Sequence, residues 1–281
     1  MRTREAAWTA AAYGATAVRV ARRGNRAGQR LPELRSEERL VFVVGSPRSG
    51  TTFLGRSLGA QPGFVDLGEV SLLKAAVPRL VGLPEDEQTR QVRAILQRVR
   101  RLALVRRLRG VEQGPETSFV LRAVLRAFPA AVAVHALRDG RDVVCSLLER
   151  GWLDAGRAGR DDATLAYGAY PRFWVEPERR EEFPRVSEAR RAAWAWRRYV
   201  AAARAVPERT VEVRYEDLVR APAEQAERLA AALQVEPEPL AAALSQAYES
   251  SVGRWRMELT AEQLADVEAE TGALLPQLGY R

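Results

Sequence analysis

Apolar and polar residues alternate along the chain in blocks that predict strands interleaved with helices. Segments of strand length occur at residues 40–44, 64–67, 131–137 and 210–214, and those at 40–44 and 131–137 are apolar runs. Between these segments, apolar residues recur every three or four positions, as in amphipathic helices. Helices are therefore expected at residues 5–20, 51–58, 85–109, 117–128, 143–150, 187–205, 221–234, 237–248 and 260–276, and one more opens at residue 68. This alternation predicts a parallel sheet with helices on both faces.

The first long apolar run is followed by a loop that begins at Gly45 and ends at Gly50. This spacing is that of a nucleotide phosphate loop, in which backbone N–H groups and the helix dipole hold an anion. Thr51, however, stands where an ATP or GTP hydrolase would carry lysine. The positive charge lies inside the loop, at Arg48. The sequence predicts a phosphate-binding loop without the usual lysine and magnesium.

A second candidate anion site follows the run at 131–137. Arg138 stands at the predicted strand end, and Ser146 lies eight residues later in the next helix. Ligands of parallel sheets bind beyond the carboxyl ends of the strands, so one anion can touch both this site and the loop at Gly45. The alternative is that Arg138 pairs with Asp139 or Asp142 and that Ser146 is an incidental helix residue. Asp142 is also a candidate cap for that helix.

The amino-acid composition limits the possible domain organisation and the possible binding partners of the chain. With 281 residues and 47% hydrophobic content, the chain can bury a full core, as one large domain or two small ones. Its net charge of +8 comes almost wholly from arginine, because Lys74 is the only lysine. That charge indicates either attraction for anionic ligands or the codon bias of a GC-rich genome. Nucleic-acid binding is disfavoured, because no binding module is recognisable and acidic residues are interspersed.

The chain has one cysteine and one histidine, which excludes disulfide bonds within the chain and metal sites built from these residues. With only Cys145 and only His135, the chain forms neither an intrachain disulfide nor a Cys/His metal cluster, and no metal is expected. A lone cysteine fits a reducing compartment, so a cytoplasmic location is expected. No apolar run of membrane-spanning length occurs. For residues 5–20, a packed helix is favoured over a signal peptide, and an amphipathic helix on a membrane surface remains the alternative.

Four segments, in order, resemble one family, the sulfotransferases that use 3'-phosphoadenosine 5'-phosphosulfate (PAPS). Gly-Ser-Pro-Arg-Ser-Gly-Thr-Thr at 45–52 resembles the family's 5'-phosphosulfate loop. Leu-Arg-Asp-Gly-Arg-Asp-Val-Val-Cys-Ser at 137–146 resembles its 3'-phosphate motif, with the same Arg-to-Ser spacing. Val-Arg-Tyr-Glu-Asp-Leu at 213–218 and Val-Gly-Arg-Trp-Arg at 252–256 resemble a third and a fourth family segment.

The resemblance implies a fold, a donor and a set of donor-binding residues. It implies one α/β domain at 40–281, a central parallel sheet flanked by helices of the P-loop nucleoside-triphosphate-hydrolase type, after an N-terminal helical extension at 1–39. PAPS would be the co-substrate. Arg48 would neutralise the phosphosulfate and the leaving phosphate. The implied donor contacts are Ser49, Gly50, Thr51 and Thr52 around the phosphosulfate, Phe53 at the adenine, and Arg138 and Ser146 at the 3'-phosphate.

A general base is needed to take the proton of a hydroxyl acceptor. His135 lies within a predicted buried strand and points away from Arg138, so it is interpreted as structural. Gly68-Glu69 resembles the Gly-Glu pair that supplies the base in tyrosyl-protein and bacterial sulfotransferases. Glu69 is therefore the predicted base, although a carboxylate at a helix start also has a purely structural explanation.

Two departures from the family pattern leave residues open. Many relatives carry a basic segment where this chain has Gly-Pro-Glu-Thr at 114–117, so a second transition-state cation is not assigned; Arg56, Lys74 and Arg122 are the alternatives. The family's Arg-Lys-Gly stretch is also absent before residue 252. Ser251 or Arg254 is expected to contribute to phosphate binding there instead.

Three functions remain in competition. The favoured one is sulfuryl transfer from PAPS to a hydroxyl, or less readily to an amine. The others are an ATP-dependent phosphotransferase, which lacks its loop lysine here, and a non-catalytic nucleotide-binding protein. The acceptor is a small molecule, glycan, lipid or peptide, in a pocket predicted to be walled by residues 68–110 and 151–186. The oligomeric state is not predicted.

Overall fold

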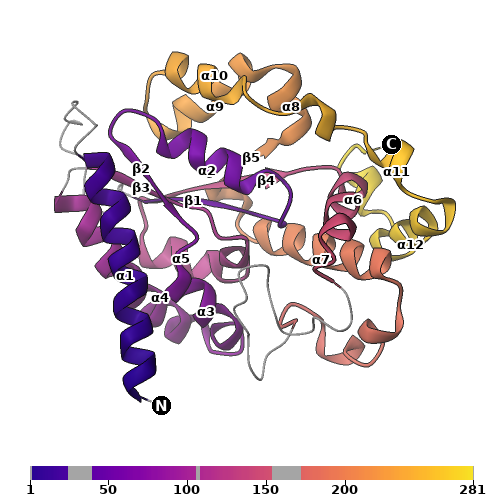
Figure 1. Cartoon of the computed structure of the whole chain (residues 1–281), viewed down its shortest axis with the longest axis horizontal. Helices are drawn as coiled ribbons and strands as arrows, with labels where there is room; N and C mark the ends of the chain where they lie inside the picture. Colours follow the sequence, from indigo (N-terminus) through magenta and orange to yellow (C-terminus); the bar gives the residue numbers. More distant parts are fainter. Residues whose placement is uncertain (1, 25–39, 106–107, 154–171, 281) are drawn as a thin grey trace.

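The computed structural model describes residues 2–24, 40–105, 108–153 and 172–280. Within these residues, five parallel strands form one sheet in the order β2-β3-β1-β4-β5. Their bounds are β1 Leu40–Gly45, β2 Phe64–Gly68, β3 Arg109–Glu112, β4 Val132–Leu137 and β5 Thr210–Arg214. The expected single parallel sheet flanked by helices is confirmed (Figure 1).

Helices cover both faces of the sheet, and the alternation along β1 explains why (Figure 1). Leu40, Phe42 and Val44 point into one buried cluster, while Val41 and Val43 point into another on the opposite face. The helices are α1 Arg2–Gly24, α2 Thr51–Gly59, α3 Ser71–Leu80, α4 Glu85–Val105, α5 Leu121–Ala127, α6 Gly140–Arg150, α7 Glu188–Ala203, α8 Tyr215–Arg220, α9 Pro222–Leu233, α10 Pro237–Leu244, α11 Trp255–Glu258, α12 Ala261–Thr271 and α13 Leu274–Gln277. In Figure 1, α2 and α8–α10 lie on one side of the sheet, and α3–α5 and α7 lie on the other.

Three sequence expectations are corrected by the structure. The helix expected at 85–109 ends at Val105, and β3 follows it at Arg109–Glu112. The helix expected at 117–128 begins as a 3₁₀ turn, Pro115–Val120, before α5. The cap of α6 is Asp139, whose carboxylate accepts from the N–H of Arg141, rather than Asp142.

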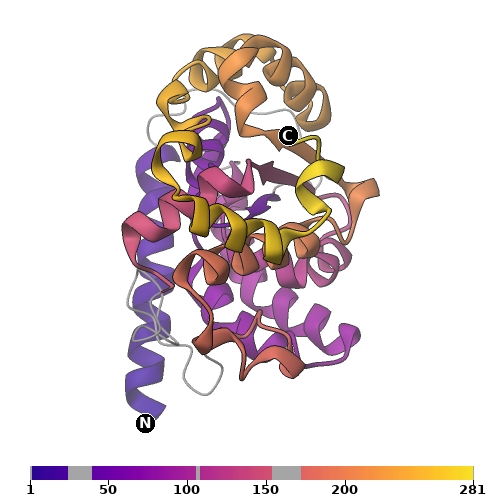
Figure 2. The same ribbon diagram turned by 90° about the vertical axis from the view of Figure 1, so that its right-hand side faces the viewer.

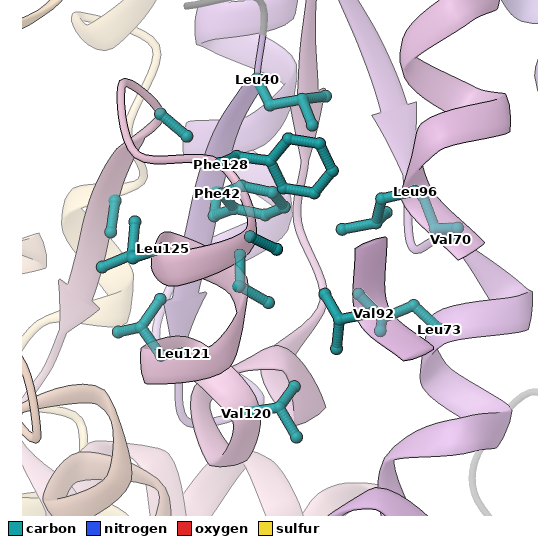
Figure 3. Packing of buried hydrophobic residues seen from close by; sticks show 14 of the residues in the cluster. Leu40, Phe42, Val70, Leu73, Val92, Leu96, Val120, Leu121, Leu125 and Phe128 are labelled. Carbon is teal, nitrogen blue, oxygen red and sulfur yellow. The ribbon is translucent and has the colours of Figure 1, made fainter. Parts of the chain in front are cut away.

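The larger cluster fixes the start of α3 against the sheet. Phe42 and Phe128 pack close together there, and Val70 and Leu73 from the start of α3 enter the same cluster (Figure 3). Val70, the N-cap residue of α3, and Leu73 in its first turn are almost fully buried. Because Leu73 is anchored in the core, the preceding turn at residues 68–70 and the following residue, Lys74, are held in fixed positions.

Helix α1 packs along the edge strand β2 and against α4. The Tyr13 hydroxyl donates to the carbonyl of Ile95 (3.1 Å), and Val20 enters the core. The Arg19 guanidinium lies against Gly68, where a Cβ would collide with it. The N-terminal end of α1 extends beyond the rest of the fold (Figures 1 and 2). No helix in the described ranges has the length and apolar content needed to cross a bilayer.

Candidate functional site

The loop between β1 and α2 has the backbone of an anion-binding turn. Gly45 and Gly50 have φ of 135° and 93°, and Arg48 also lies in the left-handed region, at 69°. A Cβ at Gly50 would lie 2.8 Å from the Tyr215 ring, so glycine is required there for both reasons. Among the described residues no side chain caps α2, so its first N–H groups face the loop. A positive φ at a non-glycine residue is strained, which is frequent at ligand sites.

The loop arginine joins the two anion motifs predicted from the sequence. Arg48 Nε donates to Ser146 Oγ (2.8 Å), and the carbonyl of Arg48 accepts from Arg138 Nη1 (3.1 Å). The Arg48 guanidinium also lies 5.6 Å from the centroid of the Trp152 ring. The structure thus brings Arg48, Arg138 and Ser146 together at the carboxyl ends of β1 and β4.

Arg138 is buried, with 5% of its surface exposed. Its Nη2 donates to the carbonyl of Ser251, and its guanidinium lies 5.3 Å from the centroid of the Tyr215 ring. No ion pair of Arg138 with Asp139 or Asp142 is found among the described residues; Asp139 pairs instead with Arg141 (2.7 Å). A buried guanidinium held by carbonyls and an aromatic ring is poised to bind an anion.

Asp142 organises the segment beside Arg138. Its carboxylate accepts from the N–H groups of Gly253 (2.8 Å) and Trp255 (3.1 Å). Burial raises the pKa of Asp142, and these two hydrogen bonds oppose the rise. The contacts hold the chain around Ser251, so that its carbonyl meets Arg138. Arg254 lies farther out and pairs with Glu258 (2.8 Å) and Glu149 (3.2 Å).

At the carboxyl ends of β1 and β4, two buried polar atoms lack a hydrogen-bond partner among the described residues. They are Ser49 Oγ, in the loop, and Arg138 Nε. Each is a donor in a buried position, which is costly without an acceptor. An anion with several oxygens, such as a phosphate or phosphosulfate, supplies acceptors of this kind. The residues present therefore fit the donor that the sequence predicts.

A cavity of about 830 Å³ opens beside the loop, and part of this volume is open to solvent. Its polar lining includes Arg48, Thr51, Thr52, Glu69, Lys74, Glu116 and Arg172. Its apolar lining includes Leu147, Trp152, Leu153, Trp174 and Tyr199. The predicted base and the loop thus share one cavity, which has an aromatic wall. Much of the predicted wall at 151–186 lies outside the described residues.

Glu69 stands at the mouth of this cavity, between β2 and α3. Its side chain is 36% exposed, and its Oε2 accepts from Lys74 Nζ (2.8 Å). The other two cations left open by the sequence lie elsewhere. Arg56 borders a separate surface groove with Arg19, and Arg122 donates to the carbonyl of Ala205 (2.8 Å).

The remaining predicted residues are placed as follows. Thr51 is buried in the first turn of α2, and Thr52 is exposed. Phe53 is half-buried and packs edge-on against Tyr215, with ring centroids 6.4 Å apart. His135 is fully buried, and its Nδ1 lies 3.0 Å from Glu212 Oε2, away from the cavity lining. Burial lowers the pKa of His135, so a neutral structural histidine fits this position.

Sequence reasoning assigned no role to Tyr215, which lies in the site, or to Glu112, whose carboxylate accepts from the N–H of Val70 next to Glu69 (3.5 Å). Tyr215 follows the end of β5 and contacts Gly50, Phe53 and Arg138. The rule that ligand sites lie past parallel strand ends was a signal for it. Glu112 ends β3 and is buried; its carboxylate accepts from the Thr117 hydroxyl (3.1 Å).

The model of the sulfotransferase family matches residues 95–239, about half of the chain. The chain belongs to the sulfotransferase family. The match includes Arg138, Ser146 and the segment at 213–218, and it begins after the loop and Glu69. No curated protein sequence gives a significant match.

Two solved sulfotransferase domains have a similar fold. One is from the olefin synthase of Synechococcus PCC 7002, with 17% identity and a TM-score of 0.52 over 86% of this chain and 98% of that domain. The other is from the curacin biosynthetic pathway, with 17% identity and a TM-score of 0.55 over 90% of this chain and 99% of that domain. Family and fold together support sulfuryl transfer in general. Among the described residues, no group of three or more His, Cys, Asp or Glu side chains is placed to hold a metal ion.

The buried carboxyl of Glu112 predicts that stability depends on pH. Burial raises its pKa from 4.5 to about 8, hydrogen bonds from Gly114, Thr117 and Val70 oppose the rise, and the charge of Glu69 adds to it. Between these pH values the unfolded chain has lost the proton that the folded chain retains, so this group's stabilising contribution falls as pH rises.

We expect Glu112→Gln, which mimics the protonated form, to lack this fall. The difference in thermal unfolding temperature, Glu112→Gln minus wild type, should increase from about pH 5 to pH 8. A difference that stays constant over this range would contradict the raised pKa of Glu112.

Proposed function

We propose that the protein transfers a sulfuryl group from PAPS to a hydroxyl of an acceptor bound in the cavity and releases adenosine 3',5'-bisphosphate. The observation that carries the proposal is the contact of Arg48 with both Ser146 and Arg138 at one sheet edge, beside a cavity that also holds Glu69. Two anion-binding motifs joined in this way suit a donor with two anionic ends.

On this proposal, the first task of the site is to bind and neutralise the donor. When bound, PAPS supplies an activated sulfuryl group whose leaving group is a phosphate. The N–H groups at the start of α2 and the Ser49 hydroxyl bind the phosphosulfate end, and Arg138 and Ser146 bind the 3'-phosphate. Arg48 stabilises the negative charge that develops on the leaving phosphate.

Glu69 acts on the acceptor in this mechanism. Its carboxylate takes the proton of the acceptor hydroxyl while the oxygen forms its bond to sulfur. The bond from sulfur to the phosphate oxygen breaks, and its electron pair stays with adenosine 3',5'-bisphosphate. Much of the remaining rate enhancement comes from holding the two reactants in line.

The cavity wall favours an acceptor with a flat or apolar body. Trp152, Trp174 and Tyr199 present ring surfaces, and Leu147 adds aliphatic surface. Such walls stack on aromatic rings or sugar faces and exclude water from the reacting groups. A hydroxyl carried on such a body would reach Glu69 from the cavity.

The function is tested by offering the protein labelled donor and a broad set of acceptors. We would incubate it with ³⁵S-labelled PAPS, a panel of phenols and alcohols, and a fractionated metabolite extract, without added magnesium. We expect label in an acceptor whose mass rises by one SO₃ group, with one adenosine 3',5'-bisphosphate released per product. Magnesium-dependent phosphate transfer from ATP, with no transfer from PAPS, would overturn the proposal.

A further inference from the structure

Lys74 occupies a position that is unfavourable for a structural residue. It is the only lysine among 44 basic residues, and only 5% of its surface is exposed. It also lies in the first turn of α3, where the helix dipole disfavours a cation. Both burial and position cost stability, so the ammonium group must be held there by specific partners.

Its partners include two carboxylates from different elements. Lys74 Nζ lies 2.8 Å from Glu69 Oε2 and 3.8 Å from Glu116 Oε1. Glu69 precedes α3, and Glu116 lies in the 3₁₀ turn Pro115–Val120. All three side chains line the cavity that also contains Arg48. The ammonium group thus links two carboxylates at the place where the acceptor is proposed to react.

We propose that Lys74 is the positioning residue for the Glu69 carboxylate and that Glu116 in turn holds Lys74. This inference rests on the proposed function. Lys74 binds Oε2 of Glu69 and so leaves Oε1 for the acceptor proton. An ammonium is a compact point charge that can face two carboxylates at once, whereas a guanidinium is a larger planar fork that favours bidentate pairing with one. This explains a lysine at one position of a chain that otherwise uses arginine.

Removal of the ammonium should slow the reaction and leave the donor site intact. For Lys74→Met and Lys74→Cys, we expect turnover of labelled PAPS with the phenol and alcohol panel to fall about 100-fold, the cost of a misplaced catalytic group. The Kd of adenosine 3',5'-bisphosphate should change less than about twofold, because Lys74 has no contact with Arg138 or Ser146 among the contacts that the structure describes.

Chemical rescue separates positioning from packing. Alkylation of Lys74→Cys with 2-bromoethylamine restores an ammonium group at nearly the length of lysine. We expect the turnover of the alkylated variant to be at least about tenfold that of the unmodified variant. Alkylation with iodoacetamide gives a neutral side chain and should recover none. Cys145 should not interfere, because burial raises the pKa of its thiol to about 12. Treated wild type is the control.

Each outcome has one meaning. The inference is overturned if Lys74→Met retains wild-type turnover, if the neutral adduct recovers as much activity as the ammonium adduct, or if both variants lose nucleotide binding. Failure of the wild type to transfer label from PAPS is a different result, because it rejects the proposed function itself.

Discussion

Glu69→Gln is expected to lower the turnover number for sulfuryl transfer by about 100- to 10,000-fold, the usual contribution of a general base. Glutamine keeps the size of the side chain and a hydrogen bond to the acceptor, but it does not accept the proton. Glu69 lines the cavity beside Arg48 and Thr51, so the loss should fall on the chemical step. Initial rates with labelled PAPS and a saturating acceptor measure it.

The donor site gives the control for this variant. Glu69 has no described contact with Arg138 or Ser146, so the Kd of adenosine 3',5'-bisphosphate should stay within about twofold of the wild-type value. Glu262→Gln, which changes an exposed carboxylate of α12, is the matched variant and should keep full activity. Full activity in Glu69→Gln would remove Glu69 from the mechanism.

Arg138→Met is expected to weaken the binding of adenosine 3',5'-bisphosphate about 10- to 100-fold. A hydrogen bond to a charged group contributes about 1.5–3 kcal/mol, and each 1.4 kcal/mol is a factor of ten. Methionine keeps much of the packing against Tyr215 and removes the guanidinium. Isothermal titration calorimetry measures the affinity, with thermal unfolding run in parallel to verify that the variant is folded.

Arg122→Met is the matched control for Arg138→Met. Arg122 is an exposed arginine of α5 that donates to a single main-chain carbonyl, that of Ala205. Its replacement removes the same charge from the protein, so a long-range effect of net charge would appear in both variants. Equal affinities in the two variants would show that Arg138 does not bind the nucleotide.

The fold was largely predictable because β1 and β4 are apolar runs and β2 and β5 still carry apolar residues at strand spacing. β1, for example, has five apolar residues before Gly45, and both of its faces are buried. β3 was missed because its sequence, Arg-Gly-Val-Glu, contains one large apolar residue. It is nevertheless buried between β1 and β2, with the Arg109 guanidinium 5.3 Å from the Phe64 ring centroid. Pairing with neighbouring strands therefore outweighed its weak local preference.

The candidate site was partly predictable because the order and direction of the strands determine which strand ends lie side by side. Arg138 and the loop at Gly45 follow strands β4 and β1, which are adjacent, so their meeting follows from the parallel topology. The ion pair between Glu69 and Lys74 did not follow from spacing. It joins a residue before α3 to one inside α3 across the extended N-cap residue Val70, a local geometry that the sequence pattern does not specify. Tyr215 required knowledge of the sheet order, which places β5 beside β4.

The two halves of the site have different physical characters. The half proposed to bind the donor consists of backbone N–H groups, the buried Arg138 and the half-buried Arg48, at the carboxyl ends of β1 and β4. The acceptor half is a cavity with aromatic walls, and Glu69 stands where the two halves meet. We therefore expect the sheet edge to recognise the anionic donor and the helices and loops around it to select the acceptor.

The most direct test of this account compares nucleotides that carry one or both phosphates. Calorimetric titration, without magnesium, would measure binding of adenosine 3',5'-bisphosphate, adenosine 5'-monophosphate and adenosine 3'-monophosphate. The account predicts that the bisphosphate binds at least about tenfold more tightly than either monophosphate, because each phosphate meets its own charged site. Equal affinities for the three nucleotides, or binding of ATP with magnesium in preference to all of them, would contradict it.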